Sequence, residues 1–121
     1  MIKLSAILVL VGGLYSLSAC KEKPDVYSGH FVYGHEVREF IPCGRSALWW
    51  QADEEVVADL LEFYQSNITQ PYQAIYVQTE AKLLPAATDG YAQDYPAVLR
   101  LDKILDWQLR VPPSCHASPQ Q

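Results

Sequence analysis

The sequence predicts a mainly β domain with one helix, because three observations agree. Apolar residues alternate with period two in five runs, turn-forming residues separate those runs, and one run with helical spacing follows the third. The order strand, strand, strand, helix, strand, strand is that of an OB-like, five-stranded, partly open barrel, in which the helix plugs one end. An α+β sheet with one packed helix is the alternative.

The first three strands are expected over residues 27–34, 36–41 and 47–51. In the first of them, Tyr27, Phe31 and Tyr33 share one face, because successive side chains of a strand point to opposite sides. Gly34 allows a turn into the second strand, and Pro42 ends that strand because proline lacks a backbone N–H. The first three strands are thus expected to follow one another through short turns.

A helix is predicted over residues 54–65. Asp53 occupies the N-cap position, and Glu54 and Glu55 fall in the first turn, where the helix dipole favours negative charge. Apolar side chains then recur at helical spacing: Val56, Val57, Leu60, Leu61 and Tyr64. This stripe indicates a helix that packs one face onto the core rather than a cofactor site.

The last two strands are expected over residues 72–83 and 97–109, on either side of the longest loop, residues 84–96. Lys103 interrupts the apolar face of the final strand and Ile104 interrupts its polar face, which predicts a bulge or bend there. Loops as long as 84–96 often carry a binding function, so this loop is a candidate binding segment.

The amino-terminal residues 1–19 are typical of an export signal. Lys3 provides a positive start, and an apolar core follows that is shorter than the roughly 20 residues of a transmembrane helix. An uncleaved membrane anchor is the alternative. Residues 17–20, LSAC, resemble the bacterial lipobox, which implies that Cys20 becomes the first residue of the mature chain and carries acyl chains.

This resemblance implies an envelope lipoprotein held in the lipid membrane through acylated Cys20. Lys21 follows the cysteine where inner-membrane lipoproteins usually carry Asp, so we expect the outer membrane, facing the periplasm. Residues 20–26 would then be the lipidated cysteine and a linker. The OB-like domain is expected over residues 27–117, with a disordered tail over 118–121.

Composition and residue spacing exclude several functions. Nine Lys or Arg against fourteen Asp or Glu give a formal charge of −5, the wrong sign for gripping nucleic acid phosphates. The spacing of residues along the sequence indicates neither a nucleophile with a base within reach nor two carboxylates in the geometry that catalysis needs. We therefore expect no enzyme, no catalytic residue, no metal site and no cofactor.

Two cysteines remain once Cys20 is assigned to the lipid. An even pair in an oxidising compartment predicts a disulfide between Cys43 and Cys115. A C-x-x-C redox pair is absent, and a metal site would have to recruit distant histidines such as His30 or His116. The bridge would close a loop of about seventy residues, for which chain entropy predicts about 4 kcal/mol of stabilisation.

The aromatic residues suggest a possible ligand surface. If Trp50 clusters with Tyr27, Tyr33 or Tyr76 on the open barrel face, these rings would form the kind of stacking surface that OB folds use for oligosaccharides. The alternative is core packing of Trp50, because one of two neighbouring strand residues, Trp49 and Trp50, points inward.

Four features resemble the carboxy-terminal OB domain of the envelope-stress lipoprotein NlpE family. They are residues 40–43, FIPC, the helix end at residues 60–64, the strand at residues 74–81, AIYVQTEA, and the late Cys115. The resemblance implies a disulfide-stabilised, lipid-anchored module that contacts another envelope protein. That family also carries an amino-terminal barrel with a C-x-x-C motif, for which residues 20–27 leave no room, so sensing by that barrel is not carried over.

From these features, two functions are expected. The first is a non-enzymatic lipoprotein whose domain binds another envelope protein in stress signalling or assembly. The second is a small-molecule or saccharide binder that uses the aromatic face and the 84–96 loop.

Overall fold

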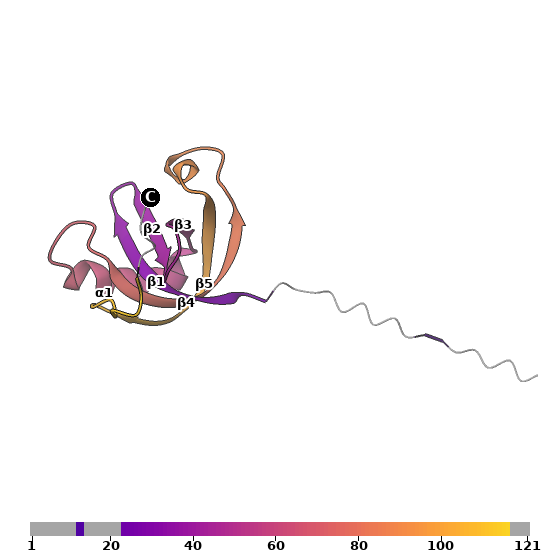
Figure 1. Cartoon of the computed structure of the whole chain (residues 1–121), viewed down its shortest axis with the longest axis horizontal. Coiled ribbons are helices and arrows are strands. Elements are labelled where there is room, and N and C mark those ends of the chain that lie inside the picture. The colour runs from indigo at the N-terminus through magenta and orange to yellow at the C-terminus, as the bar shows by residue number, and fades with distance from the viewer. Residues whose placement is uncertain (1–11, 14–22, 117–121) are drawn as a thin grey trace, which may run out of the picture.

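A computed structural model describes residues 12–13 and 23–116, and within them the chain forms five strands, one α-helix and one short 3-10 helix (Figure 1). In chain order the elements are β1 (Asp25–Gly34), β2 (Val37–Pro42), β3 (Leu48–Gln51), α1 (Glu54–Asn67), β4 (Ile75–Pro85), η1 (Tyr91–Asp94) and β5 (Ala97–Gln108). The predicted order and the single helix between the third and fourth strands are confirmed.

The five strands close into a barrel in the order β1-β2-β3-β5-β4. All pairs are antiparallel except β3 with β5. The OB-like barrel is therefore confirmed, but it is closed where the sequence predicted a partly open one. Closure results from two pairings: β1 pairs on both edges, with Phe31 opposite Phe40 of β2 and opposite Ile75 of β4, and β3 pairs with β5.

The long β4–β5 pair bends around the barrel at two irregularities. Its register shifts between Gln78 and Thr79 and again between Glu80 and Ala81, so β5 has extra residues there. The predicted bulge near residues 103–104 is confirmed. One consequence is that Leu105, which simple alternation would bury, is 42% exposed.

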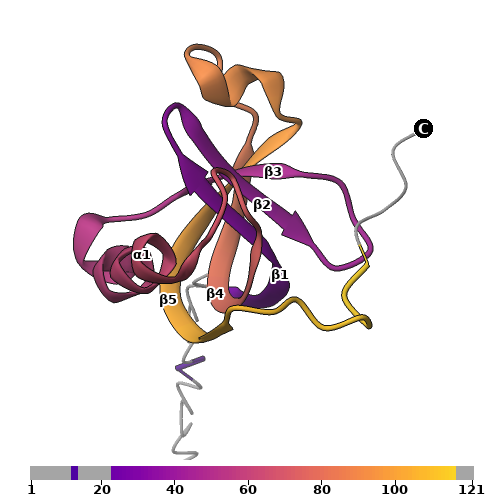
Figure 2. The same cartoon turned by 90° about the vertical axis from the view of Figure 1, so that its left-hand side faces the viewer.

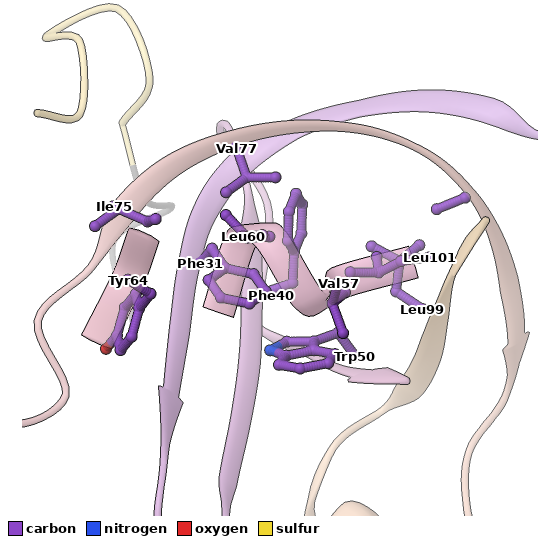
Figure 3. Close-up of a cluster of buried hydrophobic side chains, with 11 residues drawn as sticks. Phe31, Phe40, Trp50, Val57, Leu60, Tyr64, Ile75, Val77, Leu99 and Leu101 are labelled. Carbon is purple, nitrogen blue, oxygen red and sulfur yellow. The ribbon is translucent and has the colours of Figure 1, made fainter. Parts of the chain in front are cut away.

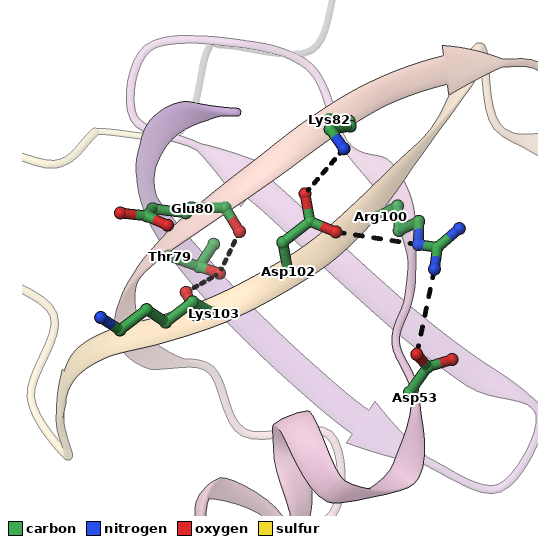
Figure 4. A network of polar contacts seen from close by, with 7 residues as sticks. All are labelled: Asp53, Thr79, Glu80, Lys82, Arg100, Asp102 and Lys103. Atoms are coloured by element: carbon green, nitrogen blue, oxygen red, sulfur yellow. Dashed lines mark hydrogen bonds and ion pairs between the residues drawn. The ribbon is translucent and has the colours of Figure 1, made fainter. Parts of the chain in front are cut away.

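Helix α1 lies beside β5 (Figure 2). Asp53 occupies its N-cap position as predicted, but the Asp53 side chain makes no capping hydrogen bond. Instead, an Asp53 carboxylate oxygen lies 3.9 Å from the guanidinium of Arg100 on β5 (Figure 4). Because both side chains are largely exposed, this ion pair contributes little to stability.

The core lies between α1 and the inward face of the strands (Figure 3). Trp50, Phe31, Phe40 and Tyr64 are its largest members, each no more than 1% exposed. The Trp50 and Phe31 rings stack with centroids 4.9 Å apart, and Tyr64 of α1 meets Phe31 edge-on at 5.8 Å. The helical stripe predicted to pack on the core does so.

One buried polar residue stabilises the bend between β4 and β5. Thr79 is fully buried, and its Oγ1 lies 2.9 Å from the carbonyl oxygen of Lys103 and 3.0 Å from that of Glu80, so its single proton is shared between these two acceptors (Figure 4). A buried hydroxyl without a partner would cost about 1–3 kcal/mol. Thr79 therefore satisfies backbone groups where the regular ladder is interrupted.

The predicted disulfide is confirmed, with Cys43 and Cys115 joined at an S–S distance of 2.03 Å. It attaches the segment after β5 to the turn after β2. His30 Nε2 donates to the Cys115 carbonyl oxygen at 2.9 Å, and the Gly44 amide donates to the His116 carbonyl. Disulfides persist in oxidising compartments, so the bridge indicates a location outside the cytoplasm.

Several sequence predictions lie outside the described residues: the signal at 1–19, the acylated Cys20, the start of the linker and the tail at 118–121. The end of the expected linker belongs to β1, which begins at Asp25 rather than Tyr27. Within residues 12–13 and 23–116, no helix has the length and apolar character needed to cross a bilayer.

Candidate functional site

A cavity of about 900 Å³ opens at the end of the barrel where β1 turns into β2. Three connecting segments reach this end in Figure 1: the β1–β2 turn, the segment between α1 and β4, and the loop that carries η1. Each contributes to the wall. Its aromatic members are Tyr33, Trp49, Tyr64, Tyr72 and Tyr91, and its charged or polar members include His35, Glu36, Arg38 and Gln65.

Two buried or half-buried tyrosines form the inner wall. Tyr33 extends the inward face of β1 and lies 6.0 Å from Trp50, and Tyr64 of α1 meets Tyr33 edge-on at 6.3 Å. The Tyr64 hydroxyl donates to the Gln73 carbonyl oxygen at 2.7 Å, which fixes the segment between α1 and β4. The cavity wall is thus continuous with the core.

Two exposed tyrosines form the rim. Tyr72 and Tyr91 are 52% and 56% exposed. Tyr72 has a positive φ of 62°, uncommon for an aromatic residue, and its hydroxyl donates weakly to the His35 carbonyl at 3.5 Å. Gly34 permits this position, because a Cβ there would lie 2.5 Å from the Tyr72 ring. Both rings are therefore free to contact a ligand.

The β1–β2 turn places charged groups beside these rings. Glu36 at the turn has a φ of 63°, and its carboxylate lies 3.2 Å from His35 Nε2. A hydrogen bond with Glu36 raises the pKa of the Tyr91 phenol. Burial, and then the charge of Glu39, raise the pKa of Tyr95, whose hydroxyl donates to that carboxylate at 3.3 Å. Arg38 supplies a guanidinium on the same wall.

Tyr64 makes the stability of this wall sensitive to alkaline pH. Burial raises the pKa of its phenol above the ordinary value of 10.0. Between the two pKa values, the folded state keeps the phenol proton that the unfolded state releases. The stability that Tyr64 contributes is therefore complete below pH 10 and is lost as pH rises through the higher pKa of the folded state. We expect the free energy of unfolding of the wild type to fall more steeply above about pH 10 than that of Tyr64→Phe. Denaturant titrations between about pH 9 and 11.5 measure this, and equal slopes would contradict it.

Of the four residues predicted to bind ligand, the structure brings together Tyr33 and Trp50, whose ring centroids lie 6.0 Å apart, and places Tyr27 and Tyr76 elsewhere. Tyr33 lines the cavity, but Trp50 is fully buried with no ring face open to solvent, so the core-packing alternative holds for it. Tyr27 lies about 20 Å from Tyr33 along β1, beside a second cavity of about 180 Å³. Tyr76 points outward from β4 and accepts a hydrogen bond from Gln78 at 3.1 Å. A ligand surface shared by all four is thus absent, because Tyr27 and Tyr76 lie at another end and on another face of the barrel from the Tyr33–Trp50 pair.

Three cavity residues were not singled out from the sequence: Arg38, Tyr72 and Tyr91. Tyr91 lies in the 84–96 loop that was expected to bind, so the segment was predicted but not the residue. Tyr72 was assigned to a strand that in fact begins at Ile75. The run from Thr69 to Tyr72, with proline at position 71, is a turn signal that could have shown this.

No group of three or more His, Cys, Asp or Glu side chains suited to a metal ion occurs in the described part of the chain. The cavity can contribute aromatic faces, hydroxyls, one guanidinium and one carboxylate, which suits binding by contact and charge. Comparison with known proteins adds no assignment: no family model, no curated protein and no solved structure matches the chain.

Proposed function

We propose that this chain is a non-enzymatic, lipid-anchored envelope protein whose barrel binds a segment of another envelope protein in stress signalling or assembly. The observation that carries the proposal is the cavity between the β1–β2 turn, the segment after α1 and η1. Loops between the first two and the last two strands are where OB folds hold their ligands. A fold can host many functions, so the residues of the cavity must define the ligand.

The composition of the cavity favours a polypeptide. Tyr, Trp and Arg are the residues most enriched where proteins bind one another, because they bury large areas and keep a polar end for hydrogen bonding. Here the exposed Tyr72 and Tyr91 flank Trp49 and Arg38. A partner segment that enters between the two tyrosines would bury rings that water now covers.

The proposed anchor would present this cavity away from the lipid. The chain enters the barrel at Asp25, close in sequence to Cys20, and β1 then runs about 30 Å to Gly34 at the cavity. The linker before Asp25 is short, so the opposite end of the barrel would face the membrane. A cavity that opens into the periplasm is accessible to a partner in the same envelope.

The resemblance to the NlpE carboxy-terminal domain is part of this proposal. The closed barrel with one helix and the Cys43–Cys115 bridge are consistent with it. A saccharide is the second candidate ligand, because the exposed rings of Tyr72 and Tyr91 could also stack on sugar faces.

Site-specific photocrosslinking in intact cells tests the proposal. A photoreactive phenylalanine at Tyr91 or Tyr72 is expected to capture one envelope protein, whereas the same group at Leu105, an exposed apolar position outside the cavity, is not. Mass analysis of the recovered chain is expected to show acylated Cys20 as its first residue. Equal capture at all three positions would contradict the cavity as the site, and quenching of tryptophan fluorescence by glycan fragments alone would favour the saccharide.

A further inference from the structure

We propose that the cavity selects an acidic segment, and that the Arg38 guanidinium binds its carboxylate. This inference rests on the proposed function and specifies the chemistry of the partner. It is carried by an arginine that is held in place by an aromatic ring and has no acidic partner among the residues that the structure describes.

Arg38 has no carboxylate partner within the described residues. The ion pairs found there use His35, Lys82 and Arg100, and none uses Arg38. Two acids flank it in sequence, but each has another contact: Glu36 with His35, and Glu39 with Tyr95. The guanidinium therefore keeps its charge available at the cavity wall.

The position of Arg38 is set by the core beneath it. Its Cζ lies 5.1 Å from the centroid of the Trp50 ring, a cation–π arrangement. Trp50 is fixed in turn, because its Nε1 donates to the Val32 carbonyl at 3.1 Å and its ring stacks on Phe31. A guanidinium over a ring keeps its in-plane N–H groups for a planar acceptor, and a carboxylate matches that geometry with two parallel hydrogen bonds.

The surroundings of Arg38 favour an extended acidic segment. Arg38 and Trp49 line both the main cavity and a neighbouring one of about 390 Å³, so a segment that passes over these two side chains would contact both cavities. The neighbouring 390 Å³ cavity is also lined by Arg100, which is already paired with Asp53 and Asp102. Of the two arginines that line these cavities, Arg38 is the one without a carboxylate partner among the described residues, and a basic or neutral segment would leave it unpaired.

The test uses a random heptapeptide library displayed on phage and selected on the immobilised full chain with the disulfide intact. The wild type is expected to enrich peptides rich in Asp and Glu. Arg38→Gln is expected to lose that enrichment, and Arg45→Gln, which removes an exposed arginine outside the cavity, is expected to keep it. Tryptophan emission and thermal unfolding check that each variant is folded.

One selected peptide then measures the contact directly. The peptide is synthesised in two forms, with Glu or with Gln at its acidic position. The Gln form is expected to bind the wild type about tenfold or more weakly than the Glu form, and both forms are expected to bind Arg38→Gln with equal affinity. Arg38→Lys is expected to restore part of the preference for the Glu form, because lysine keeps the positive charge but cannot form two parallel hydrogen bonds to a carboxylate.

The outcomes separate the two proposals. Acidic enrichment that persists in Arg38→Gln, or enrichment without acidic bias, overturns the role of Arg38 and leaves the cavity as a peptide site. If the wild type enriches no more than a Tyr72→Ala, Tyr91→Ala double variant, the cavity is not a peptide site and both proposals fail. Binding of glycan fragments without peptide enrichment also overturns both in favour of the saccharide.

Discussion

Replacing Trp50 with alanine is expected to lower the free energy of unfolding by about 3–5 kcal/mol, the range found when a large aromatic is removed from a core. Trp50 is fully buried and stacks on Phe31. The substitution would leave a void the surrounding strands cannot fill and would remove the donor to the Val32 carbonyl. Urea unfolding followed by circular dichroism measures the loss.

Trp49→Ala is the matched control for this prediction. Trp49 is next in sequence but points outward, is half-buried, and packs on Tyr95 with centroids 5.6 Å apart. Its removal is expected to cost about 1 kcal/mol. If the two substitutions cost the same, Trp50 would not be the centre of the core, and the argument that it fixes Arg38 would fail.

Local patterns were sufficient to predict most of the elements. Alternation predicted all five strands because each has one face against the core, and the spacing of Val57, Leu60 and Tyr64 predicted α1 because these side chains share one helical face. The helix extends to Asn67 rather than Gln65, and β4 begins at Ile75 rather than Tyr72. These ends differ because the chain after α1 is shaped by the hydrogen bond from Tyr64 to Gln73.

Long-range contacts decided what local patterns could not. Alternation requires Trp49 and Trp50 to point in opposite directions, but the pairing of β3 with β2 and β5, which places Trp50 opposite Leu99, determines which one is inside. The cavity depends on the same closure, because Tyr72 and Tyr91 line one cavity only when β4 and β5 fold back along the barrel. Asp53 likewise pairs with Arg100, a partner far away in sequence.

Removing the disulfide is expected to lower the free energy of unfolding by about 4 kcal/mol, a large share of the roughly 5–15 kcal/mol typical of a domain. The two cysteines are 72 residues apart, so the bridge restricts most of the unfolded chain. In the folded state, the segment that carries Cys115 keeps its hydrogen bonds to His30 and Gly44, so the barrel should retain its topology. Urea unfolding of the domain without and with a reductant measures the difference.

A Cys43→Ala, Cys115→Ala double variant is the control that separates the lost cross-link from other effects of the reductant. It is expected to unfold at the same urea concentration as the reduced wild type, and reductant should not change it further. Because the expected loss arises mainly in the unfolded chain, the circular dichroism of the folded variant should match that of the wild type. Oxidised and reduced protein with the same stability would mean that the bridge does not restrict the unfolded chain. Loss of the folded circular dichroism spectrum on reduction would mean that the barrel needs the disulfide-linked segment after β5 in order to stay folded.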